Sequence, residues 1–260
     1  MKNSNVPAKS RGVLLFAFNT DVVDYVSIAT KAARLIEHTL DLPTTIITDQ
    51  DVANNFENVR TGYAHGTAWR NGDRYLAYEL SPYDETILID SDYIQLDRSL
   101  LAILDTTSDY KLVHHNRNPK HSMSGNMGET SLDYVWATAV TFKRTSKTKL
   151  LFELVGRIQR NYSYYKKLYN IRERNFRNDY AFAIANNILS GYTMNTADSV
   201  PWTMLTFDKA ISQIDIKPNT LIVREQEHAH VIPRQNIHIM DKDYLQSDEY
   251  AKFVEQICQE

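Results

Sequence analysis

The sequence predicts an α/β protein of a single domain, in which helices flank a mixed, mostly parallel central sheet. Apolar runs typical of buried strands alternate with segments of helical periodicity along the 260 residues. The first unit, at 12–48, has the order strand, helix, strand, which predicts two parallel strands joined by a right-handed crossover. No internal repeat and no linker-like change in composition divides the chain.

The N-terminal part provides most of the expected sheet. The run "GVLLFAF" at 12–18 is apolar at consecutive positions, as expected for a strand buried on both faces. Apolar residues in 19–40 recur at the spacing of an amphipathic helix, and "TTIIT" at 44–48 is the second strand. The segment 50–67 is polar and irregular. Beyond it we expect a helix near 72–80, a strand at 86–90, a helix at 98–104 and a strand at 110–115.

The C-terminal part is expected to combine helices with short strands. The segment 116–131 has no periodicity, and we interpret it as a loop, a lid or a mobile connection. The elements expected after it are a strand at 134–142, a long helix at 147–169, a helix at 177–189, short strands at 202–207, 220–224 and 228–232, and a last helix at about 243–258.

Composition and charge exclude several classes of protein. With 43% apolar and 23% charged residues the chain is globular rather than disordered, and its net charge of −3 gives no general attraction to nucleic acid or anionic membranes. The one cysteine, Cys258, excludes a disulfide within the chain, which fits a reducing compartment. The apolar run at 13–18 is too short for a secretory core or a membrane span. We therefore expect a cytoplasmic protein with no membrane span.

The pattern D-x-D occurs three times, and one copy has a distinctive setting. Asp90 and Asp92 directly follow an apolar strand, and open α/β sheets bind ligands beyond the carboxyl ends of their strands. Two neighbouring carboxylates repel each other unless a cation lies between them. Hard oxygen ligands suit Mg²⁺ or Mn²⁺, which proteins commonly use to bind a diphosphate. The alternative is that both aspartates cap the following turn.

The other two copies have weaker settings. Asp241 and Asp243 open the last predicted helix, which favours a role as helix caps. Asp49 and Asp51 begin a turn after the second strand, although Asp49 also stands where it could face a ligand.

The residues around Asp90 resemble a known family. The stretch "LSPYDETILIDSDYIQLD" at 80–97 is similar to the D-x-D segment of GT-A-fold glycosyltransferases, above all the retaining family-eight group of glycogenin and lipopolysaccharide galactosyltransferases. Further blocks resemble that group in order along 12–245. The resemblance implies one GT-A-like domain at 11–260, and the polar residues 1–10 before it are expected to form a flexible lead. It also implies transfer of a hexose, with glucose as the expected sugar, from a UDP-sugar with retention of configuration.

The resemblance also implies roles for individual residues. Asp90, Asp92 and His238 would bind the metal, and one imidazole among oxygen ligands favours Mn²⁺ over Mg²⁺. Asp179 on the acceptor side and Arg74 on the donor side would be catalytic. The positions implied to bind the nucleotide sugar are Phe18, Asn19, Tyr25, Asp49, Arg74, Ser91 and Lys242. The structural alternatives are an ordinary strand histidine for His238, an exposed helix arginine for Arg74 and a helix cap for Asp179.

Several positions depart from the family pattern. The family's Asn-Ala-Gly stretch should fall near "VWATAVTF" at 135–142, where the asparagine is missing, and the glutamine after the acceptor-side aspartate is Tyr180. The usual histidine-glycine-lysine ending has become H-I-M-D-K, so Lys242 follows His238 at an altered spacing. Binding of the donor is therefore better supported than handling of the acceptor.

Two further groups of residues have a structural interpretation. The segment 143–177 has eleven Lys and Arg residues against Glu153 and Glu173, interleaved with tyrosines. Such a surface could receive a polyanionic or carbohydrate acceptor, but we favour a solvated helix face whose tyrosines pack inward. His228 and His230 share one face of a strand, with no further ligands to complete a metal site.

Two other functions compete with glycosyl transfer. A sugar-phosphate nucleotidyltransferase would need a glycine-rich basic loop after the first strand, and "FAFNTDVVDY" at 16–25 has no glycine. A catalytically inactive protein that binds a UDP-sugar or a carbohydrate on the same fold is the other alternative. The acceptor, whether glycan, protein or modified nucleic acid, and the oligomeric state stay open.

Overall fold

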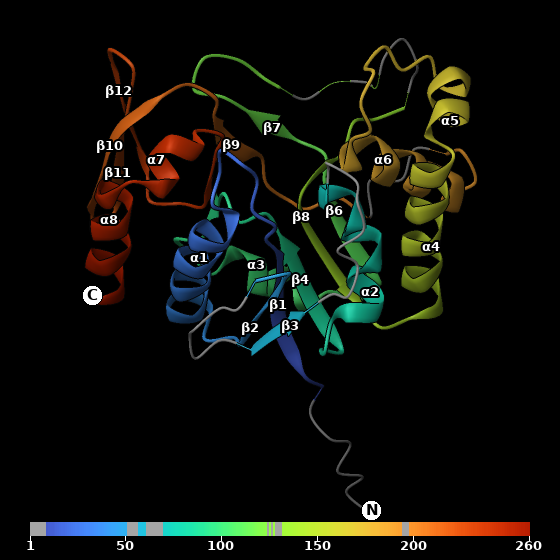
Figure 1. Ribbon diagram of the computed structural model, residues 1–260, viewed down its shortest axis with the longest axis horizontal. Coiled ribbons are helices and arrows are strands. Elements are labelled where there is room, and N and C mark those ends of the chain that lie inside the picture. The colour runs from blue at the N-terminus through green and yellow to red at the C-terminus, as the bar shows by residue number, and fades with distance from the viewer. Residues whose placement is uncertain are drawn as a thin grey trace, which may run out of the picture.

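The fold is built around a six-stranded mixed sheet (Figure 1). The structure is a computed structural model that describes residues 9–50, 57–60, 70–123, 125, 127, 132–193 and 198–260. Its strand order is β3 (Glu57–Arg60), β2 (Thr44–Thr48), β1 (Arg11–Phe16), β4 (Glu85–Ile89), β8 (Trp136–Lys143) and β6 (Tyr110–Val113). The first four run parallel, and β8 is antiparallel to both of its neighbours. The predicted mixed, mostly parallel sheet is confirmed.

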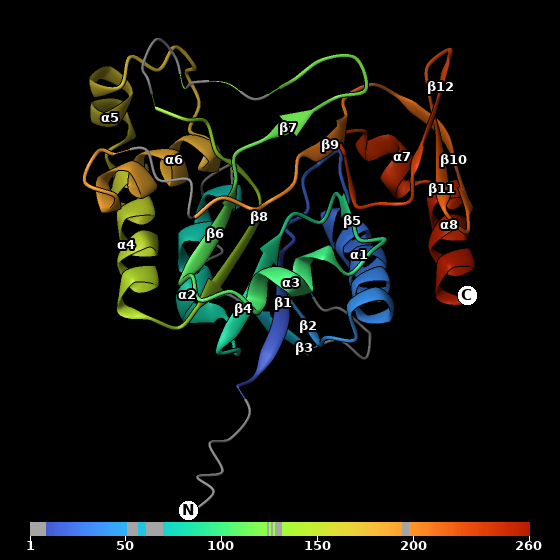
Figure 2. The same cartoon turned by 180° about the vertical axis from the view of Figure 1, so that it is seen from behind.

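Helices cover both faces of this sheet (Figure 2). Alternate residues of β1 point to opposite faces, because strand side chains have a period of two. Leu14 packs into a cluster with α2 (Ala77–Leu80), α4 (Ser146–Arg160) and α6 (Asn178–Leu189). Val13 and Leu15 pack with α1 (Tyr25–Leu40) and α3 (Ser99–Leu104). The central strands are therefore buried on both sides, which explains their unbroken apolar runs.

Two smaller sheets complete the fold. A four-stranded sheet has the order β5 (Tyr93–Ile94), β13 (Ile237–Ile239), β9 (Met204–Phe207) and β7 (Asn116–Arg117). An antiparallel meander joins β10 (Ile211–Lys217), β11 (Thr220–Glu225) and β12 (His228–Pro233). It shares a core cluster with α7 (Lys242–Gln246) and α8 (Asp248–Cys258), on the side of the molecule opposite to α4 and α5 (Tyr162–Leu168) (Figure 1).

Several short strands appear where none was predicted, among them β5 and β13, and three of them show the physical reasons. β3 lies in the segment 50–67; it is an edge strand of sequence "ENVR" whose pairing with β2 is made by backbone groups, so it has little apolar signal. β7 lies at the start of 116–131 and is only two residues long. β10 buries Ile211, Ile214 and Ile216, and the irregular register between Ile211 and Gln213 interrupts its alternation.

Two predicted helices are each divided in two. The helix predicted at 147–169 ends at Asn161, whose side-chain Nδ2 donates to Arg157 O at 2.8 Å, and α5 begins after it. The helix predicted at 243–258 is interrupted at Ser247, which has an extended backbone and caps α8 by accepting from the Tyr250 N–H at 3.2 Å. Short polar side chains that bond the neighbouring backbone commonly interrupt helices in this way.

Other predictions fall partly outside the described residues. A 3₁₀ helix at Arg70–Leu76 precedes α2, in place of the one helix expected near 72–80. The flexible lead at 1–10 and the lid interpretation of 116–131 stay predictions, because 1–8, 124, 126 and 128–131 are not described. Among the described helices, none combines the length and apolarity needed to cross a membrane.

The packing of β1 against Tyr83 yields a stability prediction. A Cβ at Gly12 would lie 2.2 Å from Cζ of Tyr83, which is 5% exposed and whose hydroxyl lies 2.8 Å from Thr45 Oγ1. We expect Gly12→Ala to lower the free energy of unfolding by roughly 1–3 kcal/mol, because the ring is held on both sides. Urea denaturation measures the loss. Gly125→Ala is the control, since no atom of the described residues lies within 4 Å of its added Cβ. An equal loss in both variants would contradict this packing.

Candidate functional site

Polar residues follow three neighbouring strands at the same edge of the central sheet. β1 leads to Phe18 and Asn19, β2 leads to Asp49, and β4 ends immediately before Asp90. Because β1, β2 and β4 are parallel, their carboxyl ends open on one edge. The Asp90 N–H donates to Thr138 O at 2.8 Å, which continues the pairing of β4 with β8 up to the aspartate.

Asp90 forms an ion pair with a buried arginine. Its Oδ1 accepts a hydrogen bond from Nη1 of Arg74, which is 2% exposed. The Nε and Nη2 atoms of Arg74 are buried and have no hydrogen-bond partner among the described residues. Although 32% of the Asp90 side chain is exposed, burial raises the pKa of Asp90 to about 6, against the lowering effect of Arg74. Arg74 is therefore a fixed buried cation with unused donors, which corrects the interpretation as an exposed helix arginine.

Asp92 has two partners from the C-terminal part of the chain. Its Oδ2 accepts a hydrogen bond from Lys242 Nζ and lies 3.5 Å from His238 Nε2. Its Oδ1 is buried and has no partner among the described residues. Burial alone would raise the pKa of Asp92, but His238 and Lys242 outweigh it and hold the pKa well below its usual range. The same contact raises the pKa of Lys242 despite its burial, so the lysine is charged.

A buried relay orients the imidazole of His238. Thr206 Oγ1 donates to Asn116 Oδ1 at 2.8 Å and lies 3.2 Å from His238 Nδ1. A hydroxyl has one proton, so in this arrangement it can only accept from Nδ1–H. In the neutral form of His238 the proton therefore stays on Nδ1, which leaves Nε2 able to bind a cation placed between it and Asp92. Without a cation, only a protonated Nε2 is attracted to the Asp92 carboxylate, whose Oδ2 lies 3.5 Å away. Ligand histidines in metal sites are commonly held by a second hydrogen bond of this kind.

The residues predicted to bind the nucleoside lie around the first strand end. Tyr25 opens α1 and is near enough to Lys242, Asp92 and Asp90 for their charges to affect its pKa, which burial raises. Asn19 Oδ1 accepts from the Val26 N–H at 2.9 Å, and Phe18 packs near Phe16. Asp49 is half-buried and accepts from Gln50 Nε2 at 3.1 Å, and Ser91 is buried between the two aspartates in sequence.

Asp179 is held in place on the other side of the sheet edge. Its Oδ1 accepts from the Ala137 N–H at 2.9 Å, and its Oδ2 accepts from Arg177 Nε at 3.0 Å. Tyr134 also bonds to it, and burial together with Asp179 raises the pKa of that tyrosine. The Asp179 charge is near enough to Asp90 to contribute to the raised pKa there. The structure therefore places Asp179 in the same electrostatic environment as Asp90.

Four residues of this site are absent from the sequence-based prediction. Arg177 and Tyr134 surround Asp179, and Asn116 and Thr206 orient His238. Arg177 could be inferred from its position two residues before Asp179. Asn116 and Thr206 are 90 residues apart in sequence, and no motif connects them.

The other singled-out residues have structural roles. Asp241 accepts from the N–H groups of Asp243 and Tyr244, so capping at this D-x-D copy is confirmed. His230 Nε2 lies 3.4 Å from Glu225 Oε2, and His228 stacks on His230. In the segment 143–177, most of the tyrosines pack partly against the core and Tyr164 is 61% exposed, which largely confirms the inward-packing interpretation.

Asp90, Asp92 and His238 carry donor atoms of the kinds that a divalent cation binds. No group of three or more His, Cys, Asp or Glu side chains is arranged as a metal site among the described residues. However, the unpartnered Asp92 Oδ1 and the Nε2 lone pair of His238 are the atoms that such an ion would use. Arg74 and Lys242 balance the two carboxylates in this structure. Lys242 would have to leave Asp92 for a metal to bind there.

Comparison with solved structures identifies the fold. The structure of galactosyltransferase LgtC in complex with donor and acceptor sugar analogs matches at a TM-score of 0.52 and 12% identity. The match covers 95% of this chain and 94% of the LgtC chain. The glycosyltransferase GlyE of Streptococcus pneumoniae TIGR4 matches at a TM-score of 0.41 and 13% identity over 69% of this chain, which spans only 43% of GlyE. No family model and no curated protein sequence matches the chain. The LgtC match confirms the expected fold class.

The ion pairs of the two aspartates lead to a pair of reciprocal pKa predictions. In the metal-free protein, Arg74→Gln should move the pKa of Asp90 above 6, because Arg74 lowers it. Lys242→Gln should instead raise the pKa of Asp92, whose carboxylate the lysine stabilises. Carboxyl ¹³C chemical shifts followed through a pH titration measure both values, and near-UV circular dichroism checks the packing. Equal shifts of both aspartates in either variant would contradict these pairings.

The relay to His238 yields a spectroscopic prediction. Thr206→Val keeps the shape of the side chain but removes the acceptor of Nδ1–H, so we expect His238 to populate both neutral tautomers. Imidazole ¹⁵N chemical shifts distinguish the tautomers. Thr141→Val, a buried substitution on β8, is the control and should leave His238 on Nδ1. A single unchanged tautomer in Thr206→Val would show that the relay does not orient the ring.

Proposed function

We propose that this protein is a metal-dependent glycosyltransferase that transfers a hexose from a UDP-sugar to an acceptor, with glucose as the expected sugar and retention of configuration. The observation that carries the proposal is the meeting of Asp90 and Asp92 with Arg74, His238 and Lys242 at the carboxyl edge of the sheet. The fold shared with LgtC, whose solved complex contains donor and acceptor sugar analogs, supports it.

Asp90, Asp92 and His238 would hold the metal, with Mn²⁺ favoured over Mg²⁺ because one ligand is an imidazole. When bound, such an ion supplies Lewis-acid stabilisation of the charge on the departing diphosphate. The tautomer fixed by Thr206 and Asn116 supports this role for His238.

Two cations of the chain would bind the diphosphate. Arg74 has Nε and Nη2 buried without partners among the described residues, and a guanidinium pairs well with phosphate oxygens. Lys242 contacts Asp92 and lies near Tyr25, so a change of rotamer would carry its charge from the carboxylate toward the donor. Both groups would stabilise the leaving nucleoside diphosphate.

The remaining positions would complete the donor and acceptor sites. Phe18, Asn19, Tyr25 and Asp49 would surround the nucleoside, and Ser91 would lie beside the diphosphate. Asp179, fixed by Ala137 and Arg177, would orient the acceptor or stabilise positive charge on the sugar ring. A cytoplasmic location, one domain at 11–260, and a glycan, protein or modified nucleic acid as acceptor belong to the same proposal.

A catalytically inactive UDP-sugar-binding protein is the second candidate. The ion pairs of Asp90 with Arg74 and of Asp92 with Lys242 favour it, because the carboxylates are already neutralised without a metal. Calorimetry that detects UDP binding with Mn²⁺, but no turnover of any sugar donor, would select this candidate.

A panel of nucleotide sugars, with and without Mn²⁺, tests the proposed function by release of UDP. We expect release from UDP-glucose in excess of other donors, and loss of release when the metal is chelated. Pyrophosphate formed from a nucleoside triphosphate and a sugar phosphate would instead indicate nucleotidyl transfer.

A substitution within the D-x-D pair sharpens this test. Asp92→Asn should lower UDP release by roughly 10³-fold, since loss of metal-assisted charge stabilisation costs several kcal/mol of the barrier. Asp243→Asn removes the same charge from an exposed D-x-D aspartate in the first turn of α7, and it should keep normal activity. Normal turnover in Asp92→Asn would refute the assigned site.

A further inference from the structure

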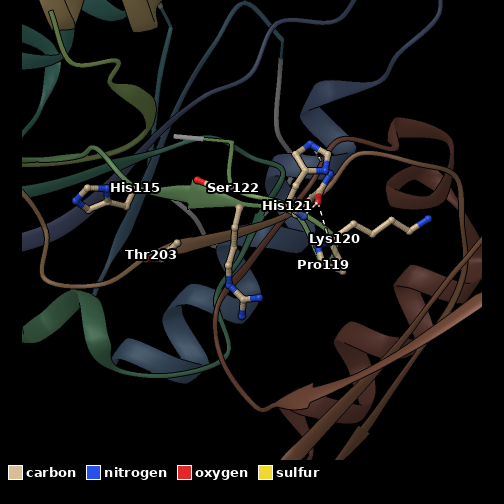
Figure 3. Close-up of a pocket in the computed structure, with 8 residues that line it drawn as sticks. His115, Pro119, Lys120, His121, Ser122 and Thr203 are labelled. Atoms are coloured by element: carbon tan, nitrogen blue, oxygen red, sulfur yellow. Dashed lines mark hydrogen bonds between the residues drawn. The ribbon is translucent and has the colours of Figure 1, made fainter. Parts of the chain in front are cut away.

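A polar pocket lies beside the β7 strand, outside the residues assigned to the donor. Its volume is about 440 Å³, and its lining includes His115, Arg117, Lys120, His121 and Thr203. His115 and Thr203 lie at one end of it, and Lys120 and His121 at the other (Figure 3). Among the described residues, the lining therefore contains one guanidinium, one ammonium and two imidazoles, and no carboxylate.

A tight hairpin fixes the backbone of this pocket. The Asn118 N–H donates to His121 O at 3.0 Å, and the Met123 N–H donates to Asn116 O at 2.8 Å. Asn118 is 5% exposed, and its Oδ1 accepts from the backbone N–H groups of Lys120 and His121 at 2.9 and 2.8 Å. Such a turn holds its residues in one conformation without help from a ligand. These hydrogen bonds thus set the backbone positions of Lys120 and His121.

The cations of the pocket have no acidic partner in the described part of the chain. Arg117 and Lys120 are both exposed, and neither forms an ion pair with a described carboxylate. By contrast, Arg11, Arg224 and Arg234, which lie on strands or directly after one, each contact an aspartate or glutamate. A concave surface that carries a guanidinium and an ammonium without a described carboxylate beside them favours an oxyanion, above all one with several oxygens.

We propose that this pocket binds a phosphate group, with Arg117 and Lys120 providing the charge and His121 a further donor. The site is distinct from the proposed donor site. Asn116 faces Thr206 and His238, whereas Arg117, the next residue of the strand, points to the opposite face of the four-stranded sheet. The proposal goes beyond the proposed function and does not depend on it. The phosphate could belong to the acceptor or be free in solution, and the experiment separates the two.

Phosphate titrations test the site directly. Inorganic phosphate and glucose 6-phosphate are titrated separately into the whole protein at low salt, with and without excess UDP, by calorimetry. We expect saturable binding with a Kd of roughly millimolar or tighter, not displaced by UDP. The double variant Arg117→Gln/Lys120→Gln should weaken it by at least about tenfold. The control Lys217→Gln/Lys252→Gln removes two exposed charges elsewhere and should bind as the natural chain does.

The outcomes separate this proposal from the proposed function. Tighter binding of glucose 6-phosphate than of inorganic phosphate assigns the site to a phosphorylated acceptor, and equal affinities assign it to free phosphate. UDP release from UDP-glucose, if the protein is a transferase, should be unchanged in Arg117→Gln/Lys120→Gln. Absence of saturable binding, or equal binding in the double variant and in its control, would overturn the phosphate site whatever the sugar-donor panel shows.

Discussion

The repulsion between two carboxylates at the end of β4 is the constraint on which this architecture depends. A strand buried on both faces delivers Asp90 and Asp92 into surroundings where charge is costly. Each aspartate pairs with its own cation. Asp90 pairs with Arg74 from the 3₁₀ helix before β4, and Asp92 pairs with Lys242 from the start of α7. Their pKa values consequently move in opposite directions, so the two aspartates are chemically distinct although they are two residues apart.

The four-stranded sheet brings the C-terminal part of the chain to this edge of the central sheet. β5 follows Asp92 directly and pairs with β13, so the His238 backbone is in register with Tyr93. β9 then pairs with β13 and places Thr206 beside the imidazole, and β7 adds Asn116. Strand pairing thus places four polar side chains from distant segments within one hydrogen-bonded group. The neighbouring Arg117 turns away to the other face, where the phosphate pocket lies.

Local patterns in the sequence predicted the central sheet and its aspartates, because buried parallel strands have continuous apolar runs. The structure also brings Asp92, His238 and Lys242 into contact. The prediction that groups these residues with Asp90 comes from a family resemblance and not from spacing. The pattern of apolar residues did not predict strands that depend on backbone pairing alone, as β3 does, or that contain a register irregularity, as β10 does. The contacts of Asn116 with Thr206 and of Tyr134 with Asp179 are tertiary, and no local pattern encodes them.

The distance along the chain between Asp92 and its lysine has a consequence during synthesis. The two residues are 150 positions apart, so a ribosome adding about 5–20 residues per second needs roughly 8–30 s to supply the second after the first. Throughout that interval β1, β2 and β4 can assemble while Asp92 has neither His238 nor Lys242 beside it. Arg74 is made before Asp90 and can already pair with it, so the nascent protein must tolerate the charge of Asp92 alone until closure of the fold brings Lys242 beside it.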